Sequence, residues 1–503
     1  MNMKIAVKKL FLFPIVIAVL YLLTCSCACK RGVNPTNTNM ASDNLAAVET
    51  NPHYMRCEDF SVLEQNKGAM DTEKIVILYS SKGTGHKSAA EAVDKVLRAS
   101  EKKLLGSNKK FVIAKVDILE GLVPKLQRFD DYMNAERWIK LKELVSLQWV
   151  AEKLVNARQA LWDNKILNRI MRACDERPPS MIISVFPIAN YVYAEIAKEN
   201  DIPLLIVPTD YEISHFINKI NELKNPPANV FMGLAMEAPE VTGGLYKKDP
   251  RHPSVPYCVI GSPLRKEFND LRKTMDRAKN PKKIKEIMNY RRSVLNIPDN
   301  AKSLLITLGG KGGSLEIIEQ YLKAFHAMQK QKPLEQALHV IVASGGSKLV
   351  IDGLKAHAAQ FANNKLFNLK VLDRLDAHNM ALCMASVDAV LAKPGGSTVA
   401  EAGMLKTPML IKSDSTLALP WEKTNMLLAK RLGWGVDLAF APKRVVDTQD
   451  VVSKLKQIFS WPKYLNQETS FIDFQTKFTE FIQLIRERET KKFSNFATLE
   501  CRQ

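Results

Sequence analysis

The chain has 503 residues, which leaves room for two globular domains and an appendage. Hydrophobic residues make up 46% and charged residues 25%, as in soluble cores, so only the extreme N-terminus is typical of membrane-embedded sequence. The net charge is +19, and Lys102–Lys142 and Arg265–Arg292 carry much of it. No nucleic-acid-binding module is recognisable and aromatic residues are only 8%, so nucleic acid is not an expected partner. We expect an anionic membrane surface as the partner, with a solvated basic face as the alternative.

Residues 1–29 are predicted to be a signal peptide or a membrane anchor. Leu10–Cys29 is nearly all apolar, which is a marginal length for a membrane span and the layout of a signal peptide. Leu22-Leu-Thr-Cys25 approximates a bacterial lipoprotein cleavage site. The lysines before the segment favour export of the body, whereas Lys30 and Arg31 oppose it, so the orientation stays open. Residues 30–72, rich in Asn, Thr, Ser and Ala, are predicted to be a flexible linker.

Residues 73–265 alternate strand and helix patterns, which predicts a parallel sheet covered on both faces. The expected strands are Ile75–Ser80, Val112–Val116, Met181–Val185, Leu204–Val207, Asn229–Met232 and Tyr257–Ile260. A helical insertion between Leu119 and Cys174 places Trp138, Trp149 and Trp162 among basic residues. That composition suits a membrane interface, with buried helix packing as the alternative.

Residues 266–300 are predicted to be a basic connection between domains, and residues 301–503 a second alternating domain with terminal helices. Its expected strands are Leu304–Leu308, Leu338–Ala343, Leu369–Leu372, Ala389–Leu391 and Met409–Ile411. The α/β pattern therefore predicts two facing Rossmann-like domains with parallel sheets. The cysteines of the body are far apart and show no zinc-ligand spacing, so we expect a reduced, metal-free body.

The most informative segment is Ala389-Val-Leu-Ala-Lys-Pro-Gly-Gly-Ser-Thr-Val-Ala-Glu-Ala402, an apolar run that turns through Gly395 and Gly396 into a helical pattern. A helix that starts after such a turn presents unpaired N–H groups at the positive end of its dipole, which suits a diphosphate. Glu401 is placed to accept hydrogen bonds from the two hydroxyls of a ribose. Equally, Thr398-x-x-Glu401 has the spacing of a capping box that needs no ligand.

A second glycine turn, Lys82-Gly-Thr-Gly-His-Lys-Ser88, follows the strand pattern Lys74–Ser81 and precedes an amphipathic helix, Ala89–Ala99. His86 falls at or next to the helix start, where the dipole disfavours the imidazolium. A neutral histidine there can act as a general base toward a hydroxyl, although a histidine near a helix start is more often incidental.

From about Glu73 to about Gly435 the chain resembles the monogalactosyldiacylglycerol synthase and processive diacylglycerol glucosyltransferase family, related to the transferase that forms lipid II. The two glycine segments carry this resemblance together with three further motifs. These are Val207-Pro-Thr-Asp-Tyr211 followed by His215, Ile260-Gly-Ser-Pro-Leu-Arg265, and Leu308-Gly-Gly-Lys-Gly-Gly313. The resemblance implies the GT-B arrangement of two Rossmann-like domains, and a hexosyltransferase that uses a UDP-sugar substrate without cofactor or metal.

The resemblance also implies roles for individual residues. His86 and Asp210 are the catalytic candidates, and Gly83, Gly85 and His215 belong to the acceptor side. Most of the candidate donor-binding residues belong to glycine segments that follow strands of the second half, and Glu422 and Asn425 resemble the family's Pro–Glu–Asn element that contacts the donor sugar. The donor-binding candidates are Gly309, Gly310, Gly345, Lys393, Gly395, Gly396, Ser397, Thr398, Glu401, Glu422 and Asn425. The chain departs from the family pattern at two places. Asn218 stands where family members often have a Trp on the acceptor side, and the Pro and Glu that precede Asn425 are one residue closer together than usual. The donor sugar of a relative is therefore not assigned to this chain.

The expected reaction is an inverting transfer in which His86 or Asp210 deprotonates an acceptor hydroxyl and helix ends stabilise the leaving diphosphate. The expected acceptor is a lipid such as diacylglycerol, at the cytoplasmic face of the inner membrane, where sugar nucleotides are available. The alternatives are a polyprenyl-linked or soluble acceptor, and a non-catalytic exported lipoprotein that keeps the fold.

Overall fold

The computed structural model describes residues 71–490, apart from several internal gaps. The gaps are 82–83, 119–169, 171–177, 188, 218, 221–227, 244, 246–254, 277–279, 309–314, 332–333, 362–363, 413–421, 439–446 and 462–471. The predicted N-terminal anchor, most of the linker and nearly all of the tryptophan-rich insertion lie outside the described residues. Within them, no helix combines the length and the apolar character needed to cross a bilayer.

The first domain is built on a six-stranded parallel sheet with the order β2-β1-β3-β4-β5-β6. Its strands are β1 (Asp71–Tyr79), β2 (Lys109–Asp117), β3 (Met181–Ser184), β4 (Leu204–Ile206), β5 (Val230–Leu234) and β6 (Tyr257–Val259). Its described helices include α3 (Thr84–Leu105), α8 (Asn190–Glu199) and α9 (Pro239–Thr242). The sequence order of the strands reverses between β1 and β3, which makes their carboxyl ends the switch point of this sheet.

The second domain has a six-stranded parallel sheet with the order β12-β11-β10-β7-β8-β9. Its strands are β7 (Lys302–Thr307), β8 (Leu338–Ala343), β9 (Phe367–Leu372), β10 (Ala389–Ala392), β11 (Met409–Lys412) and β12 (Gly435–Leu438). Its helices are α12 (Leu315–Gln331), α13 (Lys348–Phe361), α14 (Ala377–Ser386), α15 (Gly396–Met404), α16 (Glu422–Arg431) and α17 (Thr448–Phe459). The switch point lies between β7 and β10.

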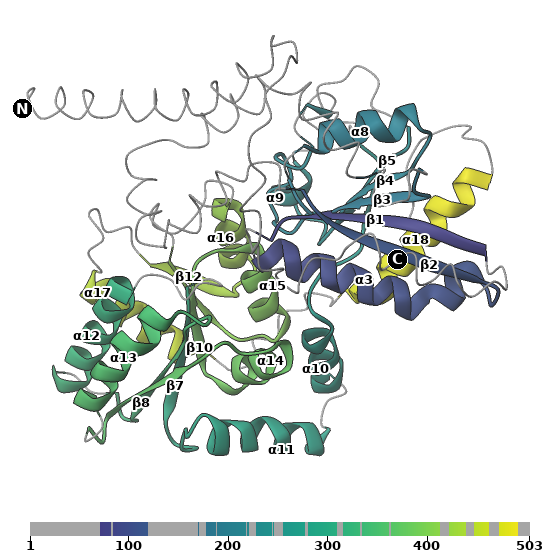
Figure 1. Ribbon diagram of the computed structural model, residues 1–503. Helices are drawn as coiled ribbons and strands as arrows, with labels where there is room; N and C mark the ends of the chain where they lie inside the picture. The colour runs from purple at the N-terminus through teal and green to yellow at the C-terminus, as the bar shows by residue number, and fades with distance from the viewer. Residues whose placement is uncertain are drawn as a thin grey trace, which may run out of the picture.

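Two Rossmann-like domains, the arrangement called GT-B, are therefore confirmed, and Figure 1 shows the two sheets in separate halves of the molecule. The central strands are apolar and buried on both faces, as in β4, β5 and β10, because helices cover both sides of each sheet. All eleven predicted strands form, with ends shifted by a few residues. The sequence missed β12, a four-residue edge strand containing Gly435 and Asp437, residue types that are depleted in strands.

The last helix, α18 (Phe474–Thr490), packs on the first domain, although the sequence assigned everything after residue 300 to the second. Its buried residues Phe474, Phe478, Phe481, Ile482 and Ile485 join the core formed by β1, β3 and α3. Polar contacts hold the same face: the hydroxyls of Ser100 and Thr479 are 2.7 Å apart, and Arg486 pairs with Glu73. The yellow α18 accordingly lies beside α3 in Figure 1.

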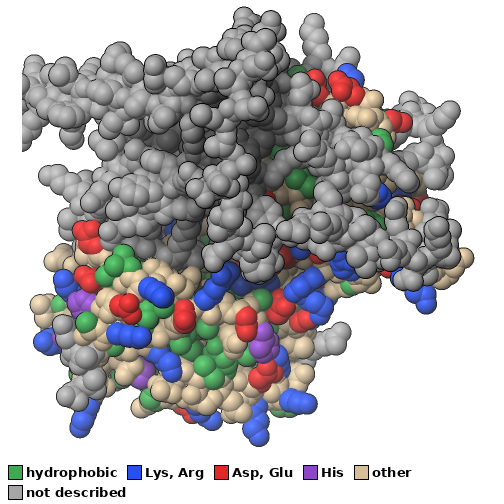
Figure 2. All heavy atoms as spheres, in the orientation of Figure 1, with side chains coloured by type: hydrophobic (Ala, Val, Ile, Leu, Met, Phe, Trp, Pro, Cys, Tyr) green, Lys and Arg blue, Asp and Glu red, His purple; other side chains and the backbone are tan. Residues whose placement is uncertain are grey.

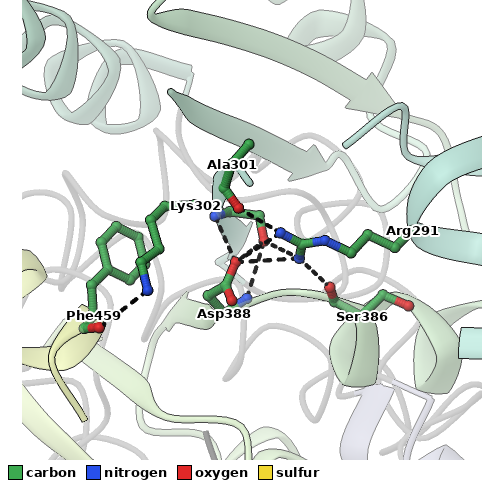
Figure 3. Close-up of polar contacts among 7 residues, drawn as sticks. Arg291, Ala301, Lys302, Ser386, Asp388 and Phe459 are labelled. Carbon is green, nitrogen blue, oxygen red and sulfur yellow. Dashed lines mark hydrogen bonds and ion pairs between the residues drawn. The ribbon is translucent and has the colours of Figure 1, made fainter. Parts of the chain in front are cut away.

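The basic connection is helical and anchored to the second domain. It comprises α10 (Lys266–Asp276), α11 (Pro281–Asn289) and a π-helical turn, η2 (Tyr290–Val294). Arg291 in this turn is buried, and Figure 3 shows its guanidinium directed at Asp388 and at backbone carbonyls near the start of the sheet. It donates to the carbonyls of Ser386 at 2.7 Å and Ala301 at 2.6 Å, and to Asp388 Oδ2 at 3.2 Å. The charge of Arg291 is therefore paired inside the fold and is not available to a membrane surface.

The expectation of a fully reduced body is wrong for one cysteine. Cys258, buried in β6, is disulfide-bonded. Cys383, in α14, is free and buried, and burial raises the pKa of its thiol to about 12.

Candidate functional site

The switch points of the two sheets bring the predicted motifs together. The turn after β1 leads into α3, and the turn after β10 leads into α15, so each sheet delivers a helix N-terminus to the space between the domains. The two helix starts face each other closely: a Cβ added to Gly85 would lie 2.9 Å from Ser397 Oγ. Figure 1 shows α3 and α15 meeting where the domains join. Two positive helix ends therefore converge on one small region.

His86 lies in the first turn of α3, as the sequence predicted, and its ring reaches the end of β3. Its Nδ1 is 3.0 Å from the carbonyl oxygen of Val185 and 3.0 Å from Thr209 Oγ1. The ring also makes an edge contact with Phe186, with ring centroids 4.9 Å apart. Because a carbonyl only accepts, this network assigns the proton of the neutral ring to Nδ1. The lone pair is then on Nε2, for which the described residues provide no hydrogen-bond partner.

Burial lowers the pKa of His86, and the charge of Lys393 lowers it further, whereas Asp210 and the hydrogen bond to Val185 raise it. The net direction is downward, so the ring is neutral at neutral pH. A neutral imidazole with a fixed tautomer and an unengaged Nε2 has the form required of a general base.

Asp210 belongs to the loop after β4 in the first domain, and its carboxylate contacts the start of α15 in the second domain. Its Oδ1 accepts from the backbone N–H of Gly396 at 3.1 Å and from Asn425 Nδ2 at 2.9 Å. Helix α15 has no side-chain cap from its own neighbourhood, because its N-cap residue is Gly395. The carboxylate of the opposite domain therefore occupies the end of the helix that the sequence assigned to a diphosphate.

Asn425, on α16, is fully buried at this junction, and its side-chain amide makes three hydrogen bonds. Its Oδ1 accepts from the N–H of Tyr211 at 2.8 Å, while Nδ2 donates to Asp210 and to the carbonyl of Pro394, the latter at 2.9 Å. One helical position away, Thr424 donates to Glu212 Oε2 at 2.9 Å. The start of α16 is thus tied to the loop after β4.

Lys393 and Glu422 form a pair on the second-domain side of the site. Lys393 Nζ lies 2.7 Å from Oε1 of Glu422, whose side chain is buried. A Cβ on Gly395 would lie 3.4 Å from Glu422 Oε1, so this turn runs against the carboxylate. The pair leaves the lysine partly exposed beside the helix start, where it is available to an anion.

Glu401 is buried and paired with the connection between the domains. Its Oε1 accepts from Arg265 Nε at 2.9 Å and Nη2 at 2.7 Å. Burial raises the pKa of Glu401, against the lowering effect of Arg265. The capping-box alternative is wrong, because α15 begins at Gly396 and Thr398 is inside its first turn. The ribose contact stays a prediction, now with Arg265 as a competing partner.

A cavity of about 10 Å³ lies between these elements. Its lining includes Thr209, Asp210 and Tyr211 of the first domain and Gly396 and Ser397 of the second. A volume of this size holds about one water molecule. Burial raises the pKa of Tyr211 to about 12, so its phenol is a neutral hydrogen-bonding group. The two domains are therefore in close contact around this cavity.

The other predicted residues fall into two groups. Gly345 lies after β8 with φ +63°, a left-handed conformation that favours glycine, and His215 is half-buried in the loop that follows β4. Gly83, Gly309 and Gly310 lie outside the described residues. No group of three or more His, Cys, Asp or Glu side chains able to hold a metal ion occurs in the described ranges.

Three contacts of the site involve residues that the sequence did not name as candidates. They are the Thr209 contact with His86, the Arg265 pair with Glu401, and the Glu212–Thr424 bond. Thr209 and Arg265 both lie inside motifs that the sequence singled out. Their partners are more than 100 residues away, so only the folded chain reveals them.

Comparisons with known proteins give distant likenesses. No protein-family model matches the chain, and no curated protein matches it. Among solved structures, MurG of Acinetobacter baumannii is 12% identical with a TM-score of 0.47, covering 82% of this chain and 99% of that one. The UDP-GlcNAc 2-epimerase of Methanocaldococcus jannaschii, in complex with UDP-GlcNAc and UDP, is 12% identical with a TM-score of 0.46, covering 83% and 99%. The glycosyltransferase SnogD of Streptomyces nogalater is 14% identical with a TM-score of 0.44, covering 82% and 100%. Likenesses of this size identify neither a family nor a substrate for this chain.

Proposed function

We propose that the protein is a glycosyltransferase that moves a hexose from a UDP-sugar to a lipid acceptor such as diacylglycerol, with inversion and without a metal. The observation that carries this proposal is the meeting of the two switch points. They bring together a neutral histidine with an unengaged Nε2 and a helix N-terminus beside Lys393. The first group suits activation of a hydroxyl, and the second suits a leaving diphosphate.

The proposed reaction follows from these positions. His86 Nε2 takes the proton of the acceptor hydroxyl, and the oxygen forms a bond to the anomeric carbon of the sugar. The bond from that carbon to the diphosphate oxygen breaks, and the diphosphate leaves with the electron pair. The N–H groups of α15 and the Lys393 ammonium stabilise its charge, and the imidazolium keeps the proton until solvent removes it.

His86 is the better base of the two catalytic candidates. One oxygen of Asp210, Oδ1, already accepts two hydrogen bonds, from the Gly396 N–H and from Asn425, so it is engaged in holding the domain junction rather than directed at an acceptor hydroxyl. Asp210 instead raises the pKa of His86 by its charge. We therefore assign proton removal to His86 and an electrostatic role to Asp210.

The lipid acceptor and the membrane site of action rest on the sequence resemblance and on the basic composition. The face of the second domain in Figure 2 shows Lys and Arg side chains interspersed with Asp and Glu. We propose that membrane contact is made by the first domain and the Lys102–Lys142 region, with the body at the cytoplasmic face of the inner membrane.

Two measurements test the function. Calorimetric titration of the full chain with UDP should show binding, while AMP at the same concentration should not compete. Incubation with UDP-glucose, UDP-galactose or UDP-N-acetylglucosamine and vesicles containing diacylglycerol should then yield a glycolipid from one of the three donors. Absence of UDP binding would overturn the proposed donor. Binding with transfer only to a polyprenyl-linked or water-soluble acceptor would replace diacylglycerol and keep the reaction.

One observation favours the second candidate, a non-catalytic exported lipoprotein. Cys258 is disulfide-bonded, and disulfides form and persist mainly in oxidising compartments, where sugar nucleotides are absent. Protease accessibility of the body in intact cells, compared with lysates, separates the two candidates. A body that is digested in intact spheroplasts supports export, and protection until lysis supports the transferase.

A further inference from the structure

The carboxylate of Asp210 lies where the proposed donor would place its phosphates. It accepts from the Gly396 N–H at 3.1 Å, although the two residues are 186 positions apart and belong to different domains. Ordinary helix caps come from the residue that precedes the helix. In α15 that residue is Gly395, which has no side chain to offer, so the helix is capped from the opposite domain.

The fit of this contact is close on both sides. A Cβ at position 396 would lie 2.2 Å from the carbonyl oxygen of Thr209 and 2.7 Å from Asp210 Oδ1. Only glycine therefore lets the two domains approach this far at this point. Asn425 fixes the carboxylate from the side by donating to the same Oδ1 at 2.9 Å, while its other contacts hold Tyr211 and Pro394. We call these contacts among Asp210, Gly396 and Asn425 the Asp210 latch.

A diphosphate cannot accept a hydrogen bond from the Gly396 N–H while Asp210 accepts it. The cavity at this junction has room for about one water molecule, and Asp210 and Gly396 both line it. The Asp210 carboxylate and a phosphate would also repel each other at the same helix end. To bind at this N–H the anion must therefore displace the carboxylate, and this breaks a contact that holds the two domains together.

We infer that Asp210 is a built-in competitor of the donor diphosphate, whose carboxylate closes the domain junction in the absence of ligand and is displaced when the donor binds. This inference rests on the proposed function for the identity of the ligand. Because the carboxylate already accepts the hydrogen bond that a phosphate would accept, donor binding must first break the latch. The observed affinity for the donor is therefore weaker than the affinity of the open site.

The test uses the full chain with two variants of the latch and one matched control. Asp210→Asn keeps the shape and removes the charge, and Asp210→Ala removes both. Thr424→Val is the control, because it removes a different interdomain hydrogen bond, to Glu212, without changing the charge at α15. Calorimetric titration measures the affinity for UDP and, separately, for inorganic pyrophosphate.

We expect both Asp210 variants to bind UDP more tightly than the wild type. The gain for Asp210→Ala is on the order of tenfold, because charge-assisted hydrogen bonds are the stronger class. Thr424→Val should change the affinity less than about twofold, since the bond that it removes, to Glu212, involves no group at the N-terminus of α15. Equal or weaker UDP binding by Asp210→Asn and Asp210→Ala would overturn the latch and leave the proposed donor intact.

Two further outcomes separate the latch from the proposed function. If UDP binds no more tightly than pyrophosphate while both anions gain from Asp210→Ala, the latch stands and the uridine donor fails. If neither anion binds any variant, hydrogen exchange of the Gly396 amide tests the latch without a ligand. The Gly396 amide should then exchange faster in Asp210→Asn than in Thr424→Val, and equal exchange rates would overturn the latch.

Discussion

At the residue scale, the two catalytic candidates, His86 and Asp210, have different hydrogen-bonding environments. His86 has one ring nitrogen fixed by Val185 and Thr209 and the other unengaged, whereas Asp210 Oδ1 is already an acceptor of two hydrogen bonds. A general base needs an available lone pair at the reacting hydroxyl, and an electrostatic group does not. The sequence could name both residues but could not rank them, because their partners come from distant segments.

Removal of the imidazole should therefore affect turnover and leave donor binding intact. We expect His86→Ala to lower kcat by about 10²–10⁴-fold, the usual contribution of a general base. Its affinity for UDP should stay within about twofold of the wild-type value, since no phosphate-binding group changes. Steady-state kinetics and calorimetric titration on the same preparation provide the comparison. Near-normal turnover in this variant would remove His86 from the mechanism.

The pH dependence of the reaction should report the lowered pKa of His86. Burial is the largest cause of this shift, and it favours the neutral ring. The acidic limb of kcat/KM should therefore lie below about pH 6.5, the ordinary histidine value. Asp210 raises this pKa and Lys393 lowers it, so Asp210→Asn should move the limb to lower pH and Lys393→Met to higher pH. Shifts in the same direction for both variants would contradict this assignment.

At the element scale, the sequence predicted where helices and strands occur better than it predicted which distant segments contact them. The apolar runs of β4, β5 and β10 are buried on both faces, so their pattern alone indicated parallel strands. The capping-box alternative would have made Thr398 the N-cap of α15, whereas the N-cap is Gly395 and the helix begins at Gly396. The cap is a carboxylate from the other domain, which no local pattern can show.

Glu401 on α15 provides a prediction that separates ligand binding from support of the fold. Glu401→Ala should weaken UDP binding by about 1–3 kcal/mol if the carboxylate contacts the ribose. Arg265→Met removes the buried ion pair but leaves the carboxylate in place, so it should lower the free energy of unfolding with a smaller loss of UDP affinity. Thermal melts and UDP titrations of both variants give the two quantities. Equal losses of affinity in the two would show that Glu401 acts only through Arg265.

Helix α18 should stabilise the first domain alone. Phe478 is fully buried in the core shared by α18, α3 and the first sheet, so Phe478→Ala should cost about 3–5 kcal/mol there. Phe325→Ala, in the core of the second domain, is the matched control. Hydrogen exchange resolves the domains: the first variant should accelerate exchange in β1 and β3, and the second in β7 and β8. A loss of protection in β7 and β8 from Phe478→Ala would contradict this division.

At the scale of the whole molecule, the charge of +19 is only partly explained by the fold. Within Arg265–Arg292, residues 265, 273, 283, 291 and 292 have acidic partners, so this stretch offers less free charge than its composition suggested. The Lys102–Lys142 region, much of it outside the described residues, is the remaining candidate for a membrane surface.

Association with anionic membranes should therefore persist when residues 1–30 are deleted. We expect the truncated protein to float with vesicles rich in anionic lipid at low salt, and to dissociate as ionic strength rises, because exposed charges are screened over about 8 Å at physiological ionic strength. Neutral phosphatidylcholine vesicles are the control. Truncated protein that stays at the bottom of the gradient at low salt would leave the N-terminal segment as the sole candidate tether.

The return of α18 to the first sheet has a consequence for the order in which the chain folds. The core of the first domain combines residues near position 75 with residues near position 480, whereas the described elements of the second sheet come from one continuous stretch. During synthesis, domains generally fold as their residues emerge, N-terminal first. Here we expect the reverse: the second domain folds early, while one apolar face of the first sheet stays uncovered until α18 is synthesised. Ribosome-stalled chains in which α18 is still inside the exit tunnel, but α17 has emerged, should show protease resistance in the second domain and sensitivity in the first.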